Sequence, residues 1–248
     1  DTEFMLRRET RGIRFQLEML KPDLGQAAQG IENTIVVYGS ARFVAADEAA
    51  ALLATAQATG DAQAIALAER AVRNARYYEL AREFAGIVAQ HSNLQELANR
   101  LYVCTGGGPG IMEAANRGAS EAGALTVGLN IALPHEQGSN PYITPTLSYR
   151  FHYFALRKMH FMMRAKALVA FPGGFGTMDE LFEVLTLVQT GKAKPVPIVL
   201  FGADFWNSLL NFQVMVDAGT IAEEDLALFH ITDDPQDAWN KIKAFYQL

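Results

Sequence analysis

The stretch ALVAFPGGFGTMDELFEVLTLVQTG (residues 167–191) holds, in order, an apolar run, a glycine turn and a segment with helical spacing. The run ALVAF (167–171) is continuously apolar and predicts a buried strand. The turn PGG follows it, and MDELFEVLTLVQTG (178–191) predicts a helix that ends at a glycine. A strand that passes through a turn into a helix is the building unit of parallel α/β sheets. This stretch therefore predicts an α/β protein.

The same pattern recurs on both sides of this stretch. Apolar runs predict further strands within TIVVYGSAR (34–42), LYVCTGGG (101–108), LTVGLNI (125–131) and PVPIVLFG (195–202), and a short strand near 229–232. Helices are predicted between them, including 111–123, 149–166, 205–219 and 233–248. Continuous apolar strands that alternate with helices are typical of a parallel sheet covered on both faces. We therefore expect a single doubly wound α/β domain over residues 31–248.

Two helical additions accompany this domain. Residues 1–30 are predicted to form an N-terminal extension, with an amphipathic helix over 1–25 that Pro22 and Gly25 end. The Ala-rich segment 44–76 is predicted to be helical and to continue through 77–91. Four arginines of the extension either form a solvated basic face or hold a phosphate or a partner; they are Arg7, Arg8, Arg11 and Arg14.

The composition excludes several classes of protein. Of 248 residues, 50% are hydrophobic, which excludes a disordered chain. Twenty-seven acidic residues against 21 basic ones give a net charge of -6, so we expect no nucleic-acid partner. No apolar run approaches the roughly 20 residues that span a bilayer, so we expect no membrane partner. The single cysteine, Cys104, and the lack of a signal-peptide core predict a reducing, cytoplasmic location.

Three predicted strands end in turns of small residues. The turns are Gly39-Ser40, TGGGPG (105–110) and PGGFGT (172–177), and the last two open helices. The first turn of a helix has unpaired N–H groups that receive a phosphate, and glycines let the backbone approach it closely. Thr177 and Ser40 add hydroxyls. Such turns can also serve tight packing alone, but two glycine loops in one small sheet favour an anion site.

Neither glycine loop matches the common nucleotide fingerprints. The dinucleotide pattern G-x-G-x-x-G fails at Ile111, and the following strand ends near Asn130 rather than at an acidic residue. A P-loop requires Gly-Lys-Ser/Thr, whereas Gly176 is followed by Thr177 and Met178. These mismatches disfavour a nicotinamide dehydrogenase and a nucleoside triphosphatase.

Charged residues flank the second glycine loop. Asp179 and Glu180 lie in the first turn of the following helix, and Glu183 comes three positions later. They either complement the helix dipole or contact the part of a ligand that is not phosphate. Arg157 and Lys158 precede the strand, on a helix rich in Phe, Tyr and Met, and are either snorkelling side chains or an anion-facing pair.

The segment RKMHFMMRAKALVAFPGGFGTMDELFEVLTLVQTGK (157–192) resembles the LONELY GUY family. Its members were described as possible lysine decarboxylases and are now regarded as nucleoside 5′-monophosphate phosphoribohydrolases. The family signature Pro-Gly-Gly-x-Gly-Thr-x-x-Glu is PGGFGTMDE (172–180) here, and an Arg-Lys pair precedes it. GGGPGIMEAANRGA (106–119) resembles the family's first glycine loop, and YGSAR (38–42) its opening turn. The resemblance implies a Rossmann-like fold, a homodimer or higher homo-oligomer, and no cofactor or metal.

The resemblance also implies an activity and a role for individual residues. The activity is hydrolysis of the N-glycosidic bond of a nucleoside 5′-monophosphate to a free base and ribose 5-phosphate. Arg157 and Glu180 would be the catalytic pair. Residues implied to bind the substrate and its phosphate are Gly173, Gly174, Gly176, Thr177, Lys158, Thr186, Ser40, Gly107 and Glu136. Glu136 is the only acidic residue in the loop 132–148, where short forms of the family use a carboxylate.

The sequence departs from the short, plant-type form of the family. It carries the two helical additions, Ala155-Leu156 replaces the family's Met-His, and the loop 132–148 differs. These features resemble a longer bacterial branch and leave the preferred base open. The substrate alternatives are AMP, another nucleoside monophosphate, or the cytokinin riboside monophosphates of cytokinin biosynthesis.

The expected chemistry needs a carboxylate near the anomeric carbon. Cleavage of the bond passes through an oxocarbenium-like state, which the Glu180 carboxylate would stabilise while it orients water. Arg157 would neutralise phosphate, orient Glu180 or assist the leaving base. The alternative function is a non-catalytic carrier of a nucleotide or of molybdenum cofactor, and such a carrier does not need this pair.

Other reactive residues are predicted to be structural. A decarboxylase would need a lysine Schiff base to pyridoxal phosphate, and no such pattern surrounds Lys158, Lys166, Lys192 or Lys194. His152 and His160 lie eight positions apart, unlike the i, i+4 spacing of a helical metal pair. Cys104 lies inside a predicted strand and is expected to be a buried apolar residue.

Overall fold

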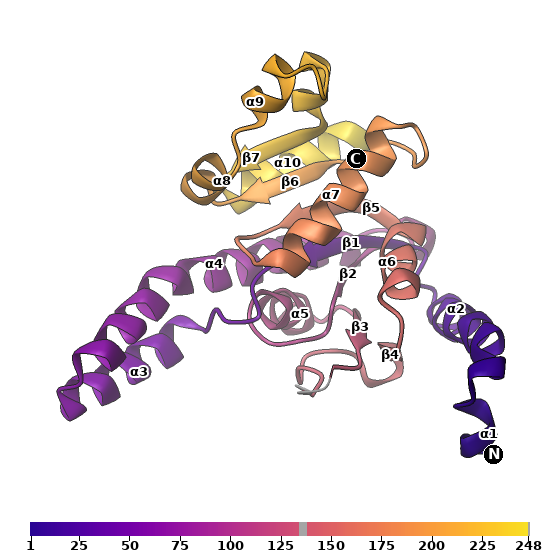
Figure 1. The fold of residues 1–248 in the computed structure, drawn as a ribbon, viewed down its shortest axis with the longest axis horizontal. Coiled ribbons are helices and arrows are strands. Elements are labelled where there is room, and N and C mark those ends of the chain that lie inside the picture. The colour runs from indigo at the N-terminus through magenta and orange to yellow at the C-terminus, as the bar shows by residue number, and fades with distance from the viewer. Residues whose placement is uncertain (134–137, 248) are drawn as a thin grey trace.

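A computed structural model describes residues 1–133 and 138–247, and its centre is a seven-stranded sheet (Figure 1). All neighbouring strands are parallel, in the order β4-β3-β2-β1-β5-β6-β7. The strands are β1 (Asn33–Tyr38), β2 (Leu101–Thr105), β3 (Thr126–Ile131), β4 (Ser148–Phe151), β5 (Ala165–Ala170), β6 (Ile198–Phe201) and β7 (Phe229–Thr232). The chain builds from β1 to one edge and then returns to β5 beside β1. Ligands of open α/β sheets bind at such a switch point, outside the carboxyl ends of the strands.

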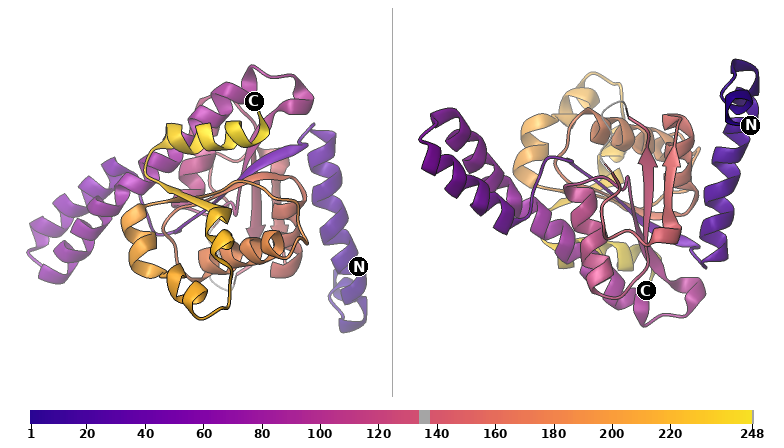
Figure 2. Two further views of the ribbon diagram at one scale, coloured as in Figure 1. Left: turned by 90° about the horizontal axis from the view of Figure 1, so that it is seen from above. Right: turned by 90° about the horizontal axis from the view of Figure 1, so that it is seen from below.

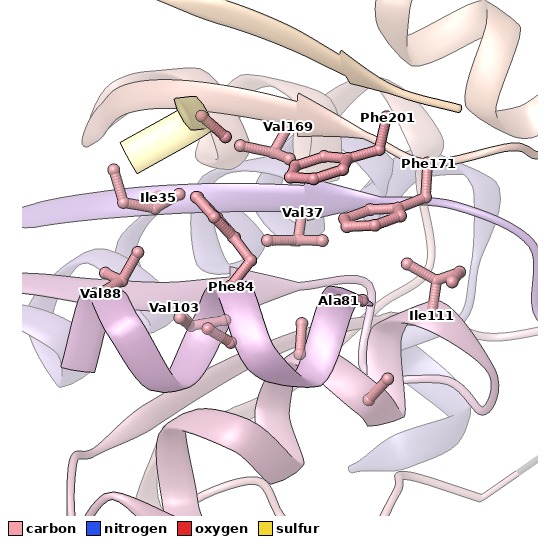
Figure 3. Close-up of a cluster of buried hydrophobic side chains, with 14 of the residues drawn as sticks. Ile35, Val37, Ala81, Phe84, Val88, Val103, Ile111, Val169, Phe171 and Phe201 are labelled. Atoms are coloured by element: carbon pink, nitrogen blue, oxygen red, sulfur yellow. The ribbon is translucent and has the colours of Figure 1, made fainter. Parts of the chain in front are cut away.

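Helices cover both faces of the sheet, which confirms the predicted fold class. One face packs against α4 (Ala62–Asn93), α5 (Ile111–Glu121) and α10 (Pro235–Tyr246), and the other against α6 (Phe154–Met163), α7 (Phe175–Gln189) and α8 (Ala203–Leu209). Side chains of a strand alternate between faces, so Ile35 and Val37 enter the first core while Val36 and Tyr38 enter the second. Figure 3 shows the first core, where Phe84 of α4 lies against Phe201 of β6.

Residues 149–166 contain most of β4, all of α6 and the start of β5, so the prediction of one helix over them was wrong. Edge strand β4 comes first, and α6 begins at Phe154. Tyr149 and Phe151 are buried while Ser148 and Arg150 are exposed, which is the two-residue alternation of a strand. The many aromatic residues here hid that alternation. Similarly, the helix predicted over 205–219 is divided into α8 and α9 (Phe212–Asp217).

The N-terminal extension contains α1 (Thr2–Met5) and α2 (Arg11–Ala28). Helix α2 continues through Pro22 and Gly25, contrary to the prediction that they end it. Tertiary contacts outweigh the local preference of proline here. Pro22 is buried, and the Tyr149 hydroxyl occupies the space that a Cβ at Gly25 would need. Asp23 forms an ion pair of 2.6 Å with Arg164, which follows α6.

The Ala-rich segment forms a helical hairpin. Helix α3 (Ala46–Thr59) turns at Gly60, which has a left-handed φ of 69°, and packs against the first part of α4. We call α3 and residues 62–76 of α4 the arm. Figures 1 and 2 show the arm and α2 at opposite ends of the molecule.

Short 3-10 helices complete the described structure, at Arg8–Thr10, Leu97–Asn99, Pro145–Leu147 and Glu223–Leu228. Among the helices of the described ranges, none has the combination of length and apolarity that crossing a membrane requires.

Candidate active site

A cleft of about 610 Å³ opens at the carboxyl ends of β1, β2, β3 and β5. Both predicted glycine loops and Ser40 line it, together with Arg157 of α6 and Glu180 of α7. The size suits a small-molecule ligand. Ser40 joins the two glycine loops through its backbone, because its N–H donates to the carbonyl of Pro172 and its carbonyl accepts from the N–H of Ile111, each at 3.0 Å.

Arg157 and Glu180 form an ion pair within the cleft. Arg157 Nη2 donates to Glu180 Oε1 at 2.9 Å, and the two side chains are only 10% and 12% exposed. The guanidinium also lies 5.1 Å from the ring centre of Phe154 and 5.6 Å from that of Phe161. Arg157 Nε is buried and has no hydrogen-bond partner within the described ranges.

Burial raises the pKa of Glu180 to about 7, although the Arg157 guanidinium opposes that rise. Neighbouring Asp179 raises the pKa further. A carboxyl group with a pKa near neutral pH suits proton transfer, and such shifted values gather at functional sites. Among the side chains that line the cleft, the Glu180 carboxyl group is therefore the one best suited to proton transfer.

The start of α7 forms one wall of the cleft. Gly174 is the N-cap and provides no side-chain cap, so the first N–H groups of the helix have no side-chain acceptor there. Thr177 is 5% exposed, and its hydroxyl occupies the space beside Gly173 that a Cβ would fill. At Gly176, no atom lies within 4 Å of the position of a Cβ, so this face of the turn is open to a ligand.

The first glycine loop is held from behind by buried polar groups. The N–H of Gly107 donates to the Thr105 hydroxyl at 2.9 Å. That hydroxyl donates to Asn116, which also accepts from Asn140, and the Asn140 amide donates to the Gly108 carbonyl. Sequence reasoning missed Asn116 and Asn140, because buried amides carry no short-range signal.

The glycines of this loop differ in what they face. Gly106 and Gly108 line the cleft. Gly107 has a left-handed φ of 73° and lies against Asn130 instead. Gly106 and Gly108 therefore line the cleft, whereas the predicted Gly107 does not.

Not every predicted site residue lies in the cleft. Lys158 lies outside the cleft lining and forms ion pairs with Asp179 at 3.2 Å and Glu183 at 2.9 Å. Thr186 donates to the carbonyl four residues before it at 2.7 Å and lines a separate hollow between α7 and α9. Gly173 lines a hollow next to the cleft. A further predicted residue, Glu136, lies outside the described residues.

The prediction missed several cleft residues, among them Tyr38 and Phe175. Tyr38, at the end of β1, is 4% exposed and lines the cleft, and burial followed by the charge of Glu180 raises the pKa of its hydroxyl. Phe175, at the variable position of the glycine turn, is 96% exposed and also lines the cleft. Two features of the sequence could have indicated these residues. Tyr38 ends a predicted strand directly before Gly39-Ser40, and Phe175 is an aromatic residue between two glycines.

The other reactive side chains do not fit a Schiff-base or thiol enzyme. Within residues 1–133 and 138–247, no lysine lines the cleft. Lys166 lies near the amino end of β5, and its Nζ is 5.7 Å from the ring centre of Tyr246 on α10. Cys104 is buried, and burial raises the pKa of its thiol, so it does not act as a nucleophile at neutral pH.

A doubly wound parallel sheet, with a cleft lined by two glycine loops and a buried Arg–Glu pair at its switch point, defines a Rossmann-type α/β protein. Residues 112–242, more than half of the chain, match the family described as "Possible lysine decarboxylase". The chain therefore belongs to this family, the LONELY GUY family.

Curated relatives carry the names of cytokinin riboside 5′-monophosphate phosphoribohydrolases. LOG7 of Arabidopsis thaliana is 43% identical over 68 residues, which are 27% of this chain and 31% of LOG7. LOG of Oryza sativa subsp. japonica is 41% identical over 70 residues, 27% of this chain and 28% of that protein. LOG5 of Arabidopsis thaliana is 29% identical over 157 residues, 61% of this chain and 67% of LOG5. The chain thus spans less than a third of the length of the first two relatives.

Solved structures share the fold. The molybdenum cofactor binding protein of Rippkaea orientalis has a TM-score of 0.54 at 16% identity, over 87% of this chain and 98% of that chain. The Moco carrier protein of Chlamydomonas reinhardtii has a TM-score of 0.50 at 21% identity, over 88% of this chain and 99% of that chain. At these identities the likeness concerns the fold alone.

Proposed function

We propose that this protein hydrolyses the N-glycosidic bond of a nucleoside 5′-monophosphate and releases the free base and ribose 5-phosphate. The observation that carries the proposal is the buried Arg157–Glu180 pair at 2.9 Å inside the cleft. Glu180 follows Thr177 by about one helical turn, a distance comparable to a ribose. Membership of the LONELY GUY family and the names of the partial relatives support the same reaction class.

The cleft suits the two ends of such a substrate. Backbone N–H groups at the start of α7, the Thr177 hydroxyl and Ser40 would hold the 5′-phosphate. Met112, Leu133 and Phe154 line the cleft and would contact the base. Binding energy at the phosphate would position the ribose without acting on the bond that breaks.

Glu180 would act in its ionised form. As the bond from C1′ to the base lengthens, positive charge develops on the ribose, and the carboxylate stabilises it. The same carboxylate orients a water molecule, whose oxygen bonds to C1′ while its proton is removed. The base leaves with the bonding electron pair and gains a proton. Arg157 holds the carboxylate in place through the hydrogen bond from its Nη2.

A carrier of molybdenum cofactor is the second candidate, because two solved structures with this fold have that name. A carrier needs an anion site but no carboxylate beside it, since a carboxylate repels the phosphate. The Arg157–Glu180 pair therefore favours the hydrolase.

We further propose a cytoplasmic homodimer, as the family resemblance implies. Phe15 and Leu20 of α2 and Met163 of α6 line a shallow apolar hollow on the surface, which suits contact between subunits. Light scattering after size-exclusion chromatography measures the molar mass and tests the proposed dimer.

The activity is tested by incubation of the protein with AMP, GMP, CMP, UMP and a cytokinin riboside monophosphate. Chromatography then follows the free base and ribose 5-phosphate. Release of base that is lost in Glu180→Gln supports the hydrolase and ranks its substrates. Absence of release, together with tight binding of a phosphorylated ligand, contradicts it and favours the carrier.

A further inference from the structure

A second hollow, of about 660 Å³, lies beside the candidate active site at the carboxyl ends of β1, β5 and β6. Phe43, Asn74 and Tyr77 line it on one side, and Asp204 and Phe205 of α8 on the other. Its size is sufficient for a nucleoside. The chemistry proposed above uses none of these residues.

The two hollows share a wall. Ser40 lines both, while Gly173 lines the second hollow and its neighbour Gly174 lines the cleft. This glycine turn is also the proposed 5′-phosphate site. A group bonded to the phosphate on the side away from the ribose would therefore pass over Ser40 into the second hollow.

Arg42 supplies a positive charge near this wall. It is exposed, lines the cleft and directly precedes Phe43 of the second hollow. Among the ion pairs of residues 1–133 and 138–247, none includes Arg42. The start of α7 already provides hydrogen-bond donors for one phosphate. A second phosphate would therefore pair with the additional positive charge of Arg42.

The lining of the second hollow suits a nucleoside. Phe43 stacks on Tyr77 at 5.7 Å between ring centres, and Arg76 donates to the Tyr77 hydroxyl at 2.8 Å, which fixes the ring pair. Aromatic rings stack nucleobases, and the Asn74 amide can both donate to and accept from a base edge. The Asp204 carboxylate can accept from ribose hydroxyls, and it disfavours a phosphate inside the hollow.

We propose that the second hollow binds the second nucleoside of a dinucleotide whose two nucleosides are joined through a diphosphate. This inference rests on the proposed function, because the first nucleotide occupies the cleft. It extends the ligands of the cleft from nucleoside 5′-monophosphates to nucleotides that continue beyond the 5′-phosphate. It also gives the arm, which carries Asn74, a role in substrate selection.

Isothermal titration calorimetry tests this with the full chain carrying Glu180→Gln, so that turnover does not consume the ligands. The ligands are AMP, ADP and P1,P2-di(adenosine-5′) diphosphate. We expect the Kd of the dinucleotide to be about ten-fold lower than that of AMP, equivalent to about 1.4 kcal/mol, with ADP between them. In Phe43→Ala or Asn74→Ala, the Kd of the dinucleotide should differ from that of ADP by less than about two-fold, and the Kd of AMP should be unchanged.

Leu67→Ala is the matched control, because Leu67 lies on the arm, is 50% exposed and does not line the hollow. Asn74→Ala keeps the test valid if Phe43→Ala unfolds the protein. The inference is overturned if the dinucleotide binds no tighter than ADP, or if both hollow variants weaken AMP and the dinucleotide equally. Base release from AMP by the unmodified protein is measured separately, so failure of the hydrolase and failure of this inference give different results.

Discussion

Arg157 and Glu180 lie 23 positions apart in the chain, on the helices before and after β5, and their side chains meet at 2.9 Å. Strand β5 and its glycine turn set this distance, because they connect α6 to α7. Burying two charges costs desolvation energy that their attraction does not necessarily recover. A buried pair beside the proposed phosphate site is therefore better explained by chemistry than by stability.

Glu180→Gln should lower kcat for base release by about 10²- to 10⁴-fold, the usual contribution of a general acid or base. The amide keeps an acceptor for Arg157 but cannot stabilise positive charge on the ribose. Steady-state kinetics with AMP should show a KM close to that of the unmodified protein. Glu224→Gln is the control, because Glu224 is exposed and lies outside the cleft lining. Equal loss of kcat in both variants would contradict the role of Glu180.

Base release should rise with pH through about 7, because burial raises the pKa of Glu180 to about 7 and the mechanism uses its ionised form. Below that pH the carboxyl group is protonated and the rate falls. A profile of kcat/KM between pH 5 and 9 measures this. The residual activity of Glu180→Gln should not show the same fall below pH 7. A rate that falls as pH rises through 7 would instead indicate that the protonated acid is the active form.

The sequence was sufficient to predict that the glycine turns meet in one cleft. A parallel sheet gathers the carboxyl ends of its strands at one edge, so the turns after β1, β2 and β5 had to meet there. Hydrogen bonds of the Ser40 backbone connect the two glycine loops, which lie at the same edge of the sheet. The Arg157–Glu180 contact was expected only from the family resemblance.

Other features depend on tertiary contacts. Thr186 follows Thr177 by nine positions, which at 3.6 residues per turn places it on about the opposite side of α7. It therefore faces the hollow beside α9 rather than the cleft. Pro22 remains helical because α2 packs on α6 and the edge of the sheet, and no local pattern around Pro22 indicates those partners.

Gly176→Ala should stabilise the fold by about 0.5–1 kcal/mol, since Gly176 lies in the first turn of α7 and its Cβ would meet no atom within 4 Å. The same methyl group should raise KM for AMP, because it faces the proposed phosphate site. Gly12→Ala on exposed α2 is the control, with a similar gain in stability and unchanged kinetics. Thermal unfolding and steady-state kinetics measure both effects. An unchanged KM in Gly176→Ala would place the phosphate elsewhere.

Glu18 should act as a positioning residue for Arg157. Its carboxylate accepts from the N–H of His152 at 3.1 Å and of Tyr153 at 3.3 Å, and Tyr153 is the N-cap of α6 without a side-chain cap of its own. Helix α2 thereby fixes the start of the helix that carries Arg157.

Glu18→Ala should cost about 1 kcal/mol, as for other lost helix caps, and should lower kcat more than it raises KM because Arg157 is less well aligned. Glu18→Gln retains one acceptor and should recover part of kcat, while Lys21→Ala, on an exposed position of α2 outside the proposed subunit contact, should change neither quantity. Denaturant unfolding gives the stability, and steady-state kinetics with AMP give the split between kcat and KM. A loss of stability in Glu18→Ala with unchanged kcat would show that α2 supports the fold without aligning Arg157.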